Sequence, residues 1–292
     1  MMRFTGKRMS IQDHLVSSLA LSLFLLTVCG LSTNGATIVT DGLVHYWTFD
    51  KDTINGKQIK DVWGKRNGII VGDPKIVAGW VREGLQFDGK DDYVNITNLG
   101  DFGSKLGSST FEAWMKTDFN KEWVTLFKVL DEGCNMGWAI EINRSALAGF
   151  PFKKNAHHFY IRDATGGCKA IAAETETILS DGKWHYVAWV VEQAEKNRVQ
   201  IYIDGQSSEV KIGQEKGPSK FINFKEPVFV GGGNNRGKLA RPFPGTLDEI
   251  RIYNRPLNAA EVKRNYQSKL GLRVEAALKL PVHWANIRRV LN

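Results

Sequence analysis

Short runs of alternating apolar and polar residues follow one another along the chain from about residue 41 onward. Gly, Asn and Asp, which favour tight turns, separate one run from the next. Trp, Phe, Val and Ile are common within the runs, as they are on the faces of β-sheets. Because helical periodicity is almost absent, the sequence predicts an all-β, antiparallel two-sheet sandwich. The main predicted strands cover residues 43–50, 84–96, 109–117, 123–130, 137–143, 157–163, 169–176, 184–192, 198–205, 226–233 and 243–253.

One short helix is predicted after this series of strands. Asn258, followed three residues later by Glu261, has the pattern of a capping box, and residues 259–267 have room for two turns. No internal repeat or linker is visible, so we predict one domain over residues 37–270. The remaining tail, residues 271–292, combines apolar and basic side chains. It is either a sorting or docking segment or a terminus packed on the domain.

The first 36 residues differ from the rest of the chain. Three basic residues precede an uncharged, apolar stretch at residues 15–31, and small residues follow it. This order predicts a secretory signal peptide over residues 1–36 with an undefined cleavage site. A lipoprotein signal at Cys29 and an uncleaved anchor are the alternatives. We therefore expect a secreted, periplasmic or cell-surface protein with no membrane span in the mature chain.

The positive charge is spread along the sequence. The formal net charge is +8, and loss of residues 1–36 removes three basic residues and Asp13, which leaves 8 − 3 + 1 = +6. No long Lys/Arg block gathers this excess. A solvated, soluble surface explains it better than nucleic-acid binding does.

Two cysteines remain in the predicted exported domain, Cys134 and Cys168. An even pair in an oxidising compartment predicts a disulfide. If residues 137–143 pair with residues 157–163 so that opposite positions sum to about 302, Ile142 faces Tyr160 and the two cysteines face each other. The thiols would then lie across the open end of a hairpin, at the separation that a disulfide requires.

The last predicted strand poses a problem of charge. Strict alternation places Asp248 on the same face as Ile250 and Ile252, which is the face expected to be buried. An ionised carboxylate is rarely buried without a partner. The sequence therefore demands a partner for Asp248.

Several segments, taken together and in this order, resemble the LamG-like jelly-roll family of the concanavalin A-like lectin/glucanase superfamily. They are LVHYWTFD (43–50), GLQFDGKDDYV (84–94), STFEAWMKT (109–117), DGKWHYVAWVVE (181–192), VQIYIDGQ (199–206) and FPGTLDEIRIYNRPLNAAEV (243–262). The resemblance implies a jelly roll whose first and last strands are neighbours. It also implies an extracellular role in recognition or adhesion, often with glycan or matrix ligands and often with a calcium ion. In one subgroup of the family a disulfide crosses the region of Cys134 and Cys168.

The implied neighbourhood of the two strands suggests a partner for Asp248. Asp50 ends the first strand, and the loop at residues 60–68 adds Asp61, Asn67 and backbone carbonyls. These oxygens are the ligands that calcium prefers, so Asp50, Asp61, Asn67 and Asp248 are predicted to hold a structural calcium ion. The loop departs from the family pattern, with Val62–Trp63 and Lys65–Arg66 in place of small polar residues. In the alternative, Asp248 accepts hydrogen bonds from backbone amides or from an arginine.

The same superfamily contains enzymes, so fold alone does not decide function. A glycoside hydrolase needs two carboxyl groups that flank the scissile bond. Asp248 and Glu249 are adjacent and are expected to point to opposite faces, and no nucleophile motif is present. We therefore expect a non-catalytic module that binds carbohydrate or another extracellular macromolecule. A glycoside hydrolase or lyase and a purely structural or adhesive module are the alternatives.

The loop at residues 231–242 is the first candidate for a ligand surface. Its glycines permit a close backbone approach, and Asn234, Asn235 and Arg236 supply hydrogen-bond donors. The alternative is that this segment is a flexible connection. The expected partner is an extracellular glycan or protein.

Overall fold

The computed structural model divides the chain into two compact units, Met1–Gly35 and Ala36–Asn292. The residues that it describes all belong to the second unit. They are residues 37–100, 108–120, 123–130, 137–144, 156–162, 170–175, 177–193, 198–212, 227–235 and 237–268. The predicted signal peptide, the tail at residues 271–292, both cysteines and Arg236 lie outside them, so the predictions for these parts stay predictions.

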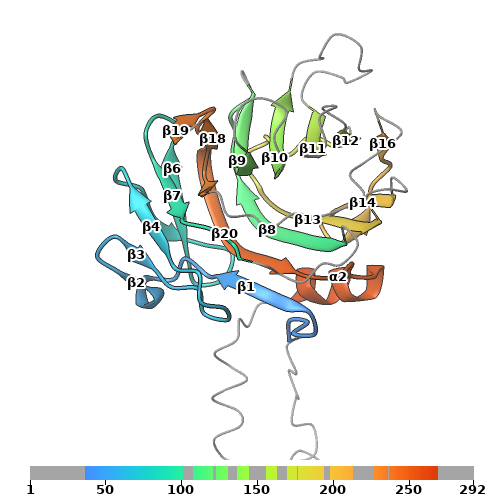
Figure 1. The fold of residues 1–292 in the computed structure, drawn as a ribbon, viewed down its shortest axis with the longest axis horizontal. Helices are drawn as coiled ribbons and strands as arrows, with labels where there is room; N and C mark the ends of the chain where they lie inside the picture. The colour runs from blue at the N-terminus through green and yellow to red at the C-terminus, as the bar shows by residue number, and fades with distance from the viewer. Residues whose placement is uncertain are drawn as a thin grey trace, which may run out of the picture. The chain divides into compact units, whose positions relative to one another are not determined.

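The domain is built from two large antiparallel sheets (Figure 1). Sheet A has eight strands. Seven follow the order β15 (Gln206–Ser207), β14 (Arg198–Ile203), β13 (Trp184–Gln193), β8 (Ser109–Lys116), β20 (Pro244–Tyr253), β6 (Glu83–Asp88) and β5 (Lys75–Ala78), and β1 (Leu43–Trp47) also pairs with β20. The predicted neighbourhood of the first and last strands is confirmed, with Trp47 opposite Ile250.

Sheet B has ten strands and faces sheet A. Their order is β16 (Lys211–Ile212), β12 (Ala170–Thr175), β11 (Ala156–Arg162), β10 (Gly137–Arg144), β9 (Val124–Leu130), β17 (Val228–Val230), β7 (Tyr93–Ile96), β4 (Gly68–Val71), β3 (Gln58–Ile59) and β2 (Ile54–Asn55). A separate hairpin joins β18 (Gly233–Asn235) to β19 (Lys238–Ala240), and a 3-10 turn, η1, spans Lys51–Thr53. The predicted jelly-roll sandwich is therefore the observed fold.

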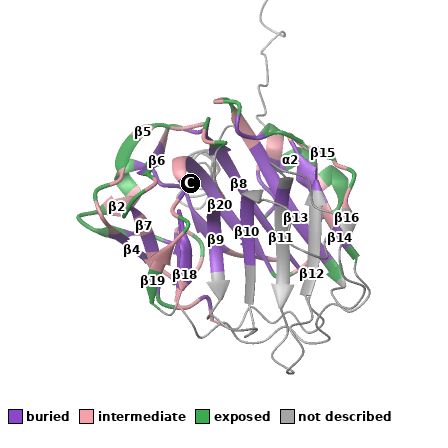
Figure 2. Cartoon of the chain, turned by 90° about the horizontal axis from the view of Figure 1, so that it is seen from above, coloured by how far each residue is buried: buried purple, intermediate pink, exposed green. Residues whose placement is uncertain are grey.

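Alternation along the strands fills an apolar core between the sheets. On β8, Phe111, Ala113 and Met115 face this core and meet side chains of sheet B such as Phe127 and Ile140. Figure 2 shows the central strands coloured as buried and the surrounding loops as exposed or intermediate. Burial of this apolar surface is the main force that holds the two sheets together.

A second core covers the opposite, outer face of sheet A. Trp114, Tyr186 and Tyr253 point outward from the sheet and pack against Val39 of the N-terminal segment and Val262 of helix α2 (Ala259–Gln267). The helix has the predicted bounds. Its predicted capping box is also present: the Asn258 side chain accepts from the Glu261 N–H at 3.0 Å, and the Glu261 carboxylate accepts from the Asn258 N–H at 2.9 Å.

A β-bulge in β20 changes the predicted face of Asp248. The pairing with β8 shifts between Asp248 and Arg251, and Glu249 has a φ of 54°. Because the bulge adds a residue to one strand, the alternation reverses beyond it. Leu247, Ile250 and Ile252 therefore face the core between the sheets. Asp248 pairs instead with Trp114, which lies on the outer face. The prediction that Asp248 shares a face with the two isoleucines was wrong.

The hairpin of β10 and β11 also has a different register from the predicted one. Tyr160 lies opposite Ala139, so paired positions sum to 299 and not to 302. A further irregularity lies between Glu141 and Arg144. Alternation predicted where the two strands lie. It did not give the length of the turn between them, so it left their register undetermined by a few residues. The disulfide between Cys134 and Cys168 remains a prediction without this register argument.

Candidate functional site

Asp61 is the centre of the loop that was predicted to bind calcium. Its buried carboxylate accepts hydrogen bonds from five groups: the N–H of Tyr46 (3.0 Å), Trp63 (3.2 Å), Gly64 (2.8 Å) and Arg66 (3.1 Å), and Nδ1 of His45 (2.7 Å). Burial raises the pKa of this carboxyl group, but the bonds from His45 and the backbone outweigh it and lower the pKa below its usual value. Both oxygens already have protein donors.

Asp50 and Asn67, two further predicted calcium ligands, also accept hydrogen bonds within the protein. Asp50 accepts from Nη1 of Arg82 at 3.0 Å and from the N–H of Glu83 at 3.3 Å. The side-chain oxygen of Asn67 accepts from the N–H of Asp61 at 3.0 Å. The guanidinium of Arg82 therefore supplies the positive charge beside Asp50.

Asp248 has the partners that the alternative interpretation foresaw. Its Oδ2 accepts from the N–H of Trp80 at 2.8 Å and from the N–H of Val81 at 2.9 Å, and the residue is fully buried. Its Oδ1 has no hydrogen-bond partner in the described structure. Burial, and then the nearby charge of Glu249, raise the pKa of Asp248 well above its usual range, although the two amide bonds act the other way. Burial thus favours the neutral acid, which reduces the need for a counter-charge.

The four predicted ligands do not form one site. Within the described residues, the carboxylates of Asp50, Asp61 and Asp248 do not gather within ligand distance of a common point. Among the described residues, three carboxylates come that close together at Asp88, the last residue of β6, and at Asp91 and Asp92 in the turn before β7. Asp88 and Asp92 accept backbone N–H groups of that region. A calcium ion requires 6–8 oxygen ligands. Of the side-chain oxygens of the four predicted ligands, Oδ1 of Asp248 alone has no hydrogen-bond partner in the described part of the chain, so the predicted set does not fit the ion.

We expect calcium to leave the melting temperature of chelator-treated protein unchanged, because Asp50 and Asp61 already have protein partners. Differential scanning calorimetry with and without calcium checks this expectation. The variant Asp248→Asn serves as the control, since it keeps an oxygen to accept the two amide bonds but cannot be a carboxylate ligand. A rise in melting temperature that Asp248→Asn abolishes would restore the predicted site.

The predicted ligand loop turns out to be a hairpin with its own internal contacts. The Asn234 side chain is buried; its Nδ2 donates to the carbonyl of Pro227 at 2.9 Å and its Oδ1 accepts from the N–H of Gly237 at 2.8 Å. Both polar groups of the Asn234 side chain therefore form hydrogen bonds that shape the hairpin. Asn235 is half-buried in β18, opposite Lys238. Turn asparagines often bond nearby backbone groups in this way, and the ligand-binding role of Asn234 and Asn235 stays a prediction.

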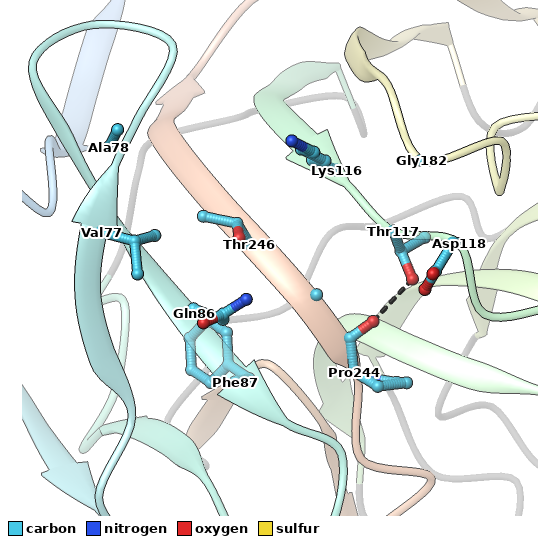
Figure 3. Close-up of a pocket in the computed structure, with 11 residues that line it drawn as sticks. Val77, Ala78, Gln86, Phe87, Lys116, Thr117, Asp118, Gly182, Pro244 and Thr246 are labelled. Carbon is cyan, nitrogen blue, oxygen red and sulfur yellow. Dashed lines mark hydrogen bonds between the residues drawn. The ribbon is translucent and has the colours of Figure 1, made fainter.

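A pocket of about 520 Å³ opens on the outer face of sheet A and is named the sheet pocket (Figure 3). Its floor is a row of side chains that pairing places side by side: Gln86 on β6 faces Thr246 on β20, and Thr246 faces Lys116 on β8. Trp184 of β13 continues the row as the neighbour of Lys116. The lining residues are Val77, Ala78, Gln86, Phe87, Lys116, Thr117, Asp118, Gly182, Pro244, Gly245 and Thr246.

The sheet pocket combines apolar and polar groups in a rigid frame. Val77 and Pro244 supply apolar surface, while Gln86, Lys116 and Asp118 are exposed and offer an amide, an ammonium and a carboxylate. Figure 3 shows Thr117 bonded to Pro244, with its hydroxyl donating to the carbonyl at 2.6 Å. Such a surface suits a ligand with both C–H faces and hydroxyl groups.

The rim of the sheet pocket is held by His185. Its ring contacts Asp204 at 2.9 Å and Asp181, the neighbour of the lining residue Gly182, at 3.1 Å. The bond to Asp204 raises the pKa of His185, burial lowers it, and the bond to Asp181 adds to the rise, with a raised pKa as the result. The protonated ring therefore persists above its usual pH range and ties the rim to sheet A.

The sequence analysis did not find the sheet pocket. Its residues come from segments between residue 77 and residue 246, and none of them belongs to a recognisable motif. The signal for this pocket in the sequence was a polar side chain at an outward-facing strand position, as at Gln86 and Lys116. That signal becomes useful only when the strand order is known, since neighbours across the sheet are distant in sequence.

Solved structures with similar folds include the following three domains. Domain 4 of AbnA, a GH43 extracellular arabinanase from Geobacillus stearothermophilus, solved with arabinotriose, has a TM-score of 0.57 at 17% identity; the match covers 77% of this chain and 98% of that one. The binding domain of Paraclostridial Mosquitocidal Protein 1 has a TM-score of 0.56 at 19% identity, covering 77% and 52%. The binding domain of Botulinum neurotoxin DC in complex with SialylT has a TM-score of 0.56 at 14% identity, covering 79% and 52%.

These likenesses establish the fold, and the chain spans about half the length of the two toxin binding domains. A search of curated proteins finds no match. The family model described as the concanavalin A-like lectin/glucanases superfamily matches residues 88–263, which is more than half of the 292-residue chain. This protein therefore belongs to the concanavalin A-like lectin/glucanases superfamily.

Proposed function

We propose that this protein is an extracellular, non-catalytic module that binds carbohydrate, with the sheet pocket as its ligand site. The observation that carries the proposal is the row of Gln86, Thr246 and Lys116 across three strands, beside the exposed carboxylate of Asp118. Sugars present many hydroxyl groups, which amides, carboxylates and ammonium groups bind well. The similar folds include a domain solved with arabinotriose and toxin binding domains, which supports a binding role.

The distribution of carboxyl groups favours binding over hydrolysis. Glycoside hydrolysis uses two carboxyl groups about 5–10 Å apart across the bond that breaks. The sheet pocket is lined by a single carboxylate, that of Asp118. Asp248 and Glu249 are close enough to influence each other, but both are buried and neither lines this pocket. Among the lining residues the hydrolase alternative therefore lacks a second carboxyl group, and Asp181 at the rim is bonded to His185.

Export remains part of the proposal and rests on the N-terminal sequence. In the part of the chain that the structure describes, no helix is both long and apolar enough to cross a membrane. The proposed site does not depend on how the protein is anchored. A protein receptor on the same surface is the second candidate, since toxin binding domains with this fold are known in complex with a protein as well as a glycan.

Binding of arabinotriose and of a panel of neutral oligosaccharides to residues 37–292 tests the proposal by calorimetry. Ala78→Trp places a large side chain at the exposed wall of the sheet pocket and should abolish binding. Lys116→Ala should weaken it by about tenfold, which corresponds to the loss of one or two hydrogen bonds.

Ile76→Trp is the matched control, because Ile76 lies on the same strand, is 41% exposed and does not line the pocket. It should bind as the wild type does. A panel that stays blank while a protein partner co-purifies and is lost in Ala78→Trp would replace the glycan with a protein ligand. Release of reducing ends that Asp118→Asn abolishes would favour the hydrolase.

A further inference from the structure

We propose that a second pocket, formed by the β2–β3 hairpin and the loop at residues 60–67, binds the acidic group of a carbohydrate, a carboxylate or a sulfate. This loop pocket has a volume of about 400 Å³. Its site and its ligand chemistry differ from those of the sheet pocket, and the two proposals share no lining residue.

The walls of the loop pocket are held by backbone bonds. Asn55 pairs with Gln58 across the β2–β3 hairpin, and the N–H of Lys60 donates to the carbonyl of Thr53 at 2.9 Å. On the other side, the Asp61 carboxylate gathers the backbone N–H groups of the loop, including Gly64 at 2.8 Å. Hydrogen bonds to the backbone therefore define both walls of the pocket.

The loop pocket is lined by two lysines and two aspartates, and the segment that forms it is basic. Residues 51–67 contain five basic side chains, Lys51, Lys57, Lys60, Lys65 and Arg66, against two acidic ones, Asp52 and Asp61, which gives +3. The two acidic groups are already engaged within the protein. Asp52 pairs with Nη2 of Arg82 at 3.1 Å, and Asp61 is saturated by five donors.

Two lysines that line the pocket remain for a ligand. Lys60 and Lys65 are exposed, and neither forms an ion pair within the described part of the chain. In a cavity with other polar walls, two such ammonium groups attract an anion, and the attraction weakens as salt is added. The pair therefore selects a ligand with negative charge.

The remaining polar side chains indicate that the anion is part of a sugar. Asn55, Gln58 and Asn67 are exposed and line the same pocket. Amide side chains both donate and accept hydrogen bonds, which matches neighbouring hydroxyl groups. Nucleic acid is a poorer fit, since single strands are held largely by stacking of bases on aromatic side chains and no aromatic residue lines this pocket.

The proposal is tested by binding of four probes to residues 37–292 at low and at moderate salt. The probes are oligogalacturonate for a carboxylate, a heparin oligosaccharide for a sulfate, a neutral dextran oligosaccharide and single-stranded DNA. We expect binding of at least one acidic oligosaccharide and none of the neutral one. Lys60→Ala/Lys65→Ala should weaken that binding by about a hundredfold, or tenfold for each charge contact removed.

The matched control is Lys90→Ala/Lys263→Ala, which removes the same charge from two exposed lysines that do not line the pocket. It should retain wild-type affinity. Equal losses in both double variants would mean attraction to the overall charge and would overturn the site. Equal affinity for DNA and acidic sugar, or no binding of either acidic sugar, would also overturn it. Ala78→Trp should leave this binding intact, so the two proposed sites fail or succeed separately.

Discussion

Replacing Arg251 with methionine is expected to lower the free energy of unfolding at pH 7 by about 3–5 kcal/mol, since breaking a buried ion pair leaves uncompensated charge. Arg251 is 1% exposed, and its Nη1 donates to Glu112 at 2.9 Å. Its Nη2 donates to Glu249. The carboxylates of Glu112 and Glu249 are also buried. The variant therefore leaves two negative charges without a positive partner in the second core, which covers the outer face of sheet A.

The loss should spread beyond the ion pairs because the same network holds the covering segments. The Asn265 side chain of α2 donates to both oxygens of Glu112 at 3.0 Å and accepts from the N–H of Val39 at 2.7 Å. The hydroxyl of Tyr186 donates to Glu112, and that of Tyr46 donates to Glu249. The helix and the N-terminal segment are thus anchored to sheet A through groups that Arg251 neutralises.

The deficit of Arg251→Met should depend on pH in a defined direction. Burial raises the pKa of Glu249, and Arg251 offsets part of that rise. Without Arg251 the pKa of the folded state rises further above that of the unfolded state. The folded variant is then favoured at low pH and loses stability as the pH rises. Urea unfolding at pH 5 and pH 7 should show the smaller deficit at pH 5.

Arg198→Met is the matched control for this prediction. Arg198 pairs with Glu192 at 3.2 Å, but both side chains are 54% exposed. The same substitution there should change stability by less than about 1 kcal/mol, as for most exposed pairs. If Arg251→Met costs no more than Arg198→Met, the network does not stabilise the domain. Partial rescue of Arg251→Met by Glu112→Gln would confirm that unpaired buried charge causes the loss.

Replacing Asp61 with alanine should destabilise the domain by about 3 kcal/mol or more, since each buried donor left without a partner costs about 1–3 kcal/mol. The variant removes the acceptor for four backbone N–H groups and for His45. The N–H of Tyr46 belongs to β1, so the loss reaches the strand that pairs with β20. Thermal and urea unfolding measure the effect.

The deficit of Asp61→Ala, like that of Arg251→Met, should become smaller as the pH falls, but it does so in a more acidic range. The folded state holds the pKa of Asp61 below its usual value, so its contribution is complete above about pH 4 and is lost as the pH falls through the lower, folded-state pKa. The deficit of Asp61→Ala should therefore shrink in acid. Asp91→Ala, at an exposed aspartate, is the control and should stay within about 0.5 kcal/mol of the wild type. An equal loss in both variants would contradict the role given to Asp61.

The capping box and the strand motifs were readable from the sequence because they depend on near neighbours. Asn258 and Glu261 are three residues apart, and the helix that they cap has the predicted bounds. The alternating runs likewise predicted most of the strands of both sheets. The family resemblance predicted that β1 and β20 are neighbours. In the fold, the predicted face of Asp248 and the predicted register of the β10–β11 hairpin were wrong, and both depend on irregularities in pairing.

Asp61 shows why the predicted site did not form as expected. The sequence predicted correctly that Asp61 lies in a polar loop after the first strand. An aspartate at that place can be a metal ligand or can accept hydrogen bonds from backbone amides. The choice depends on how many N–H groups the folded chain turns toward the carboxylate; here the loop supplies three, and β1 supplies a fourth through Tyr46. A one-dimensional pattern does not contain that geometry.

The sequence by itself determined the sandwich and its short helix, because side-chain periodicity and capping act over a few residues. Its motifs, taken together, carried the resemblance to the superfamily. The tertiary structure alone decided where the sheet pocket and the loop pocket lie and which charges are paired. One added residue at Glu249 reversed the faces of β20. Strand pairing then set Gln86, Thr246 and Lys116 side by side from three distant segments. Such arrangements arise from long-range register, which depends on the packing of the whole sheet and is not encoded in any single strand.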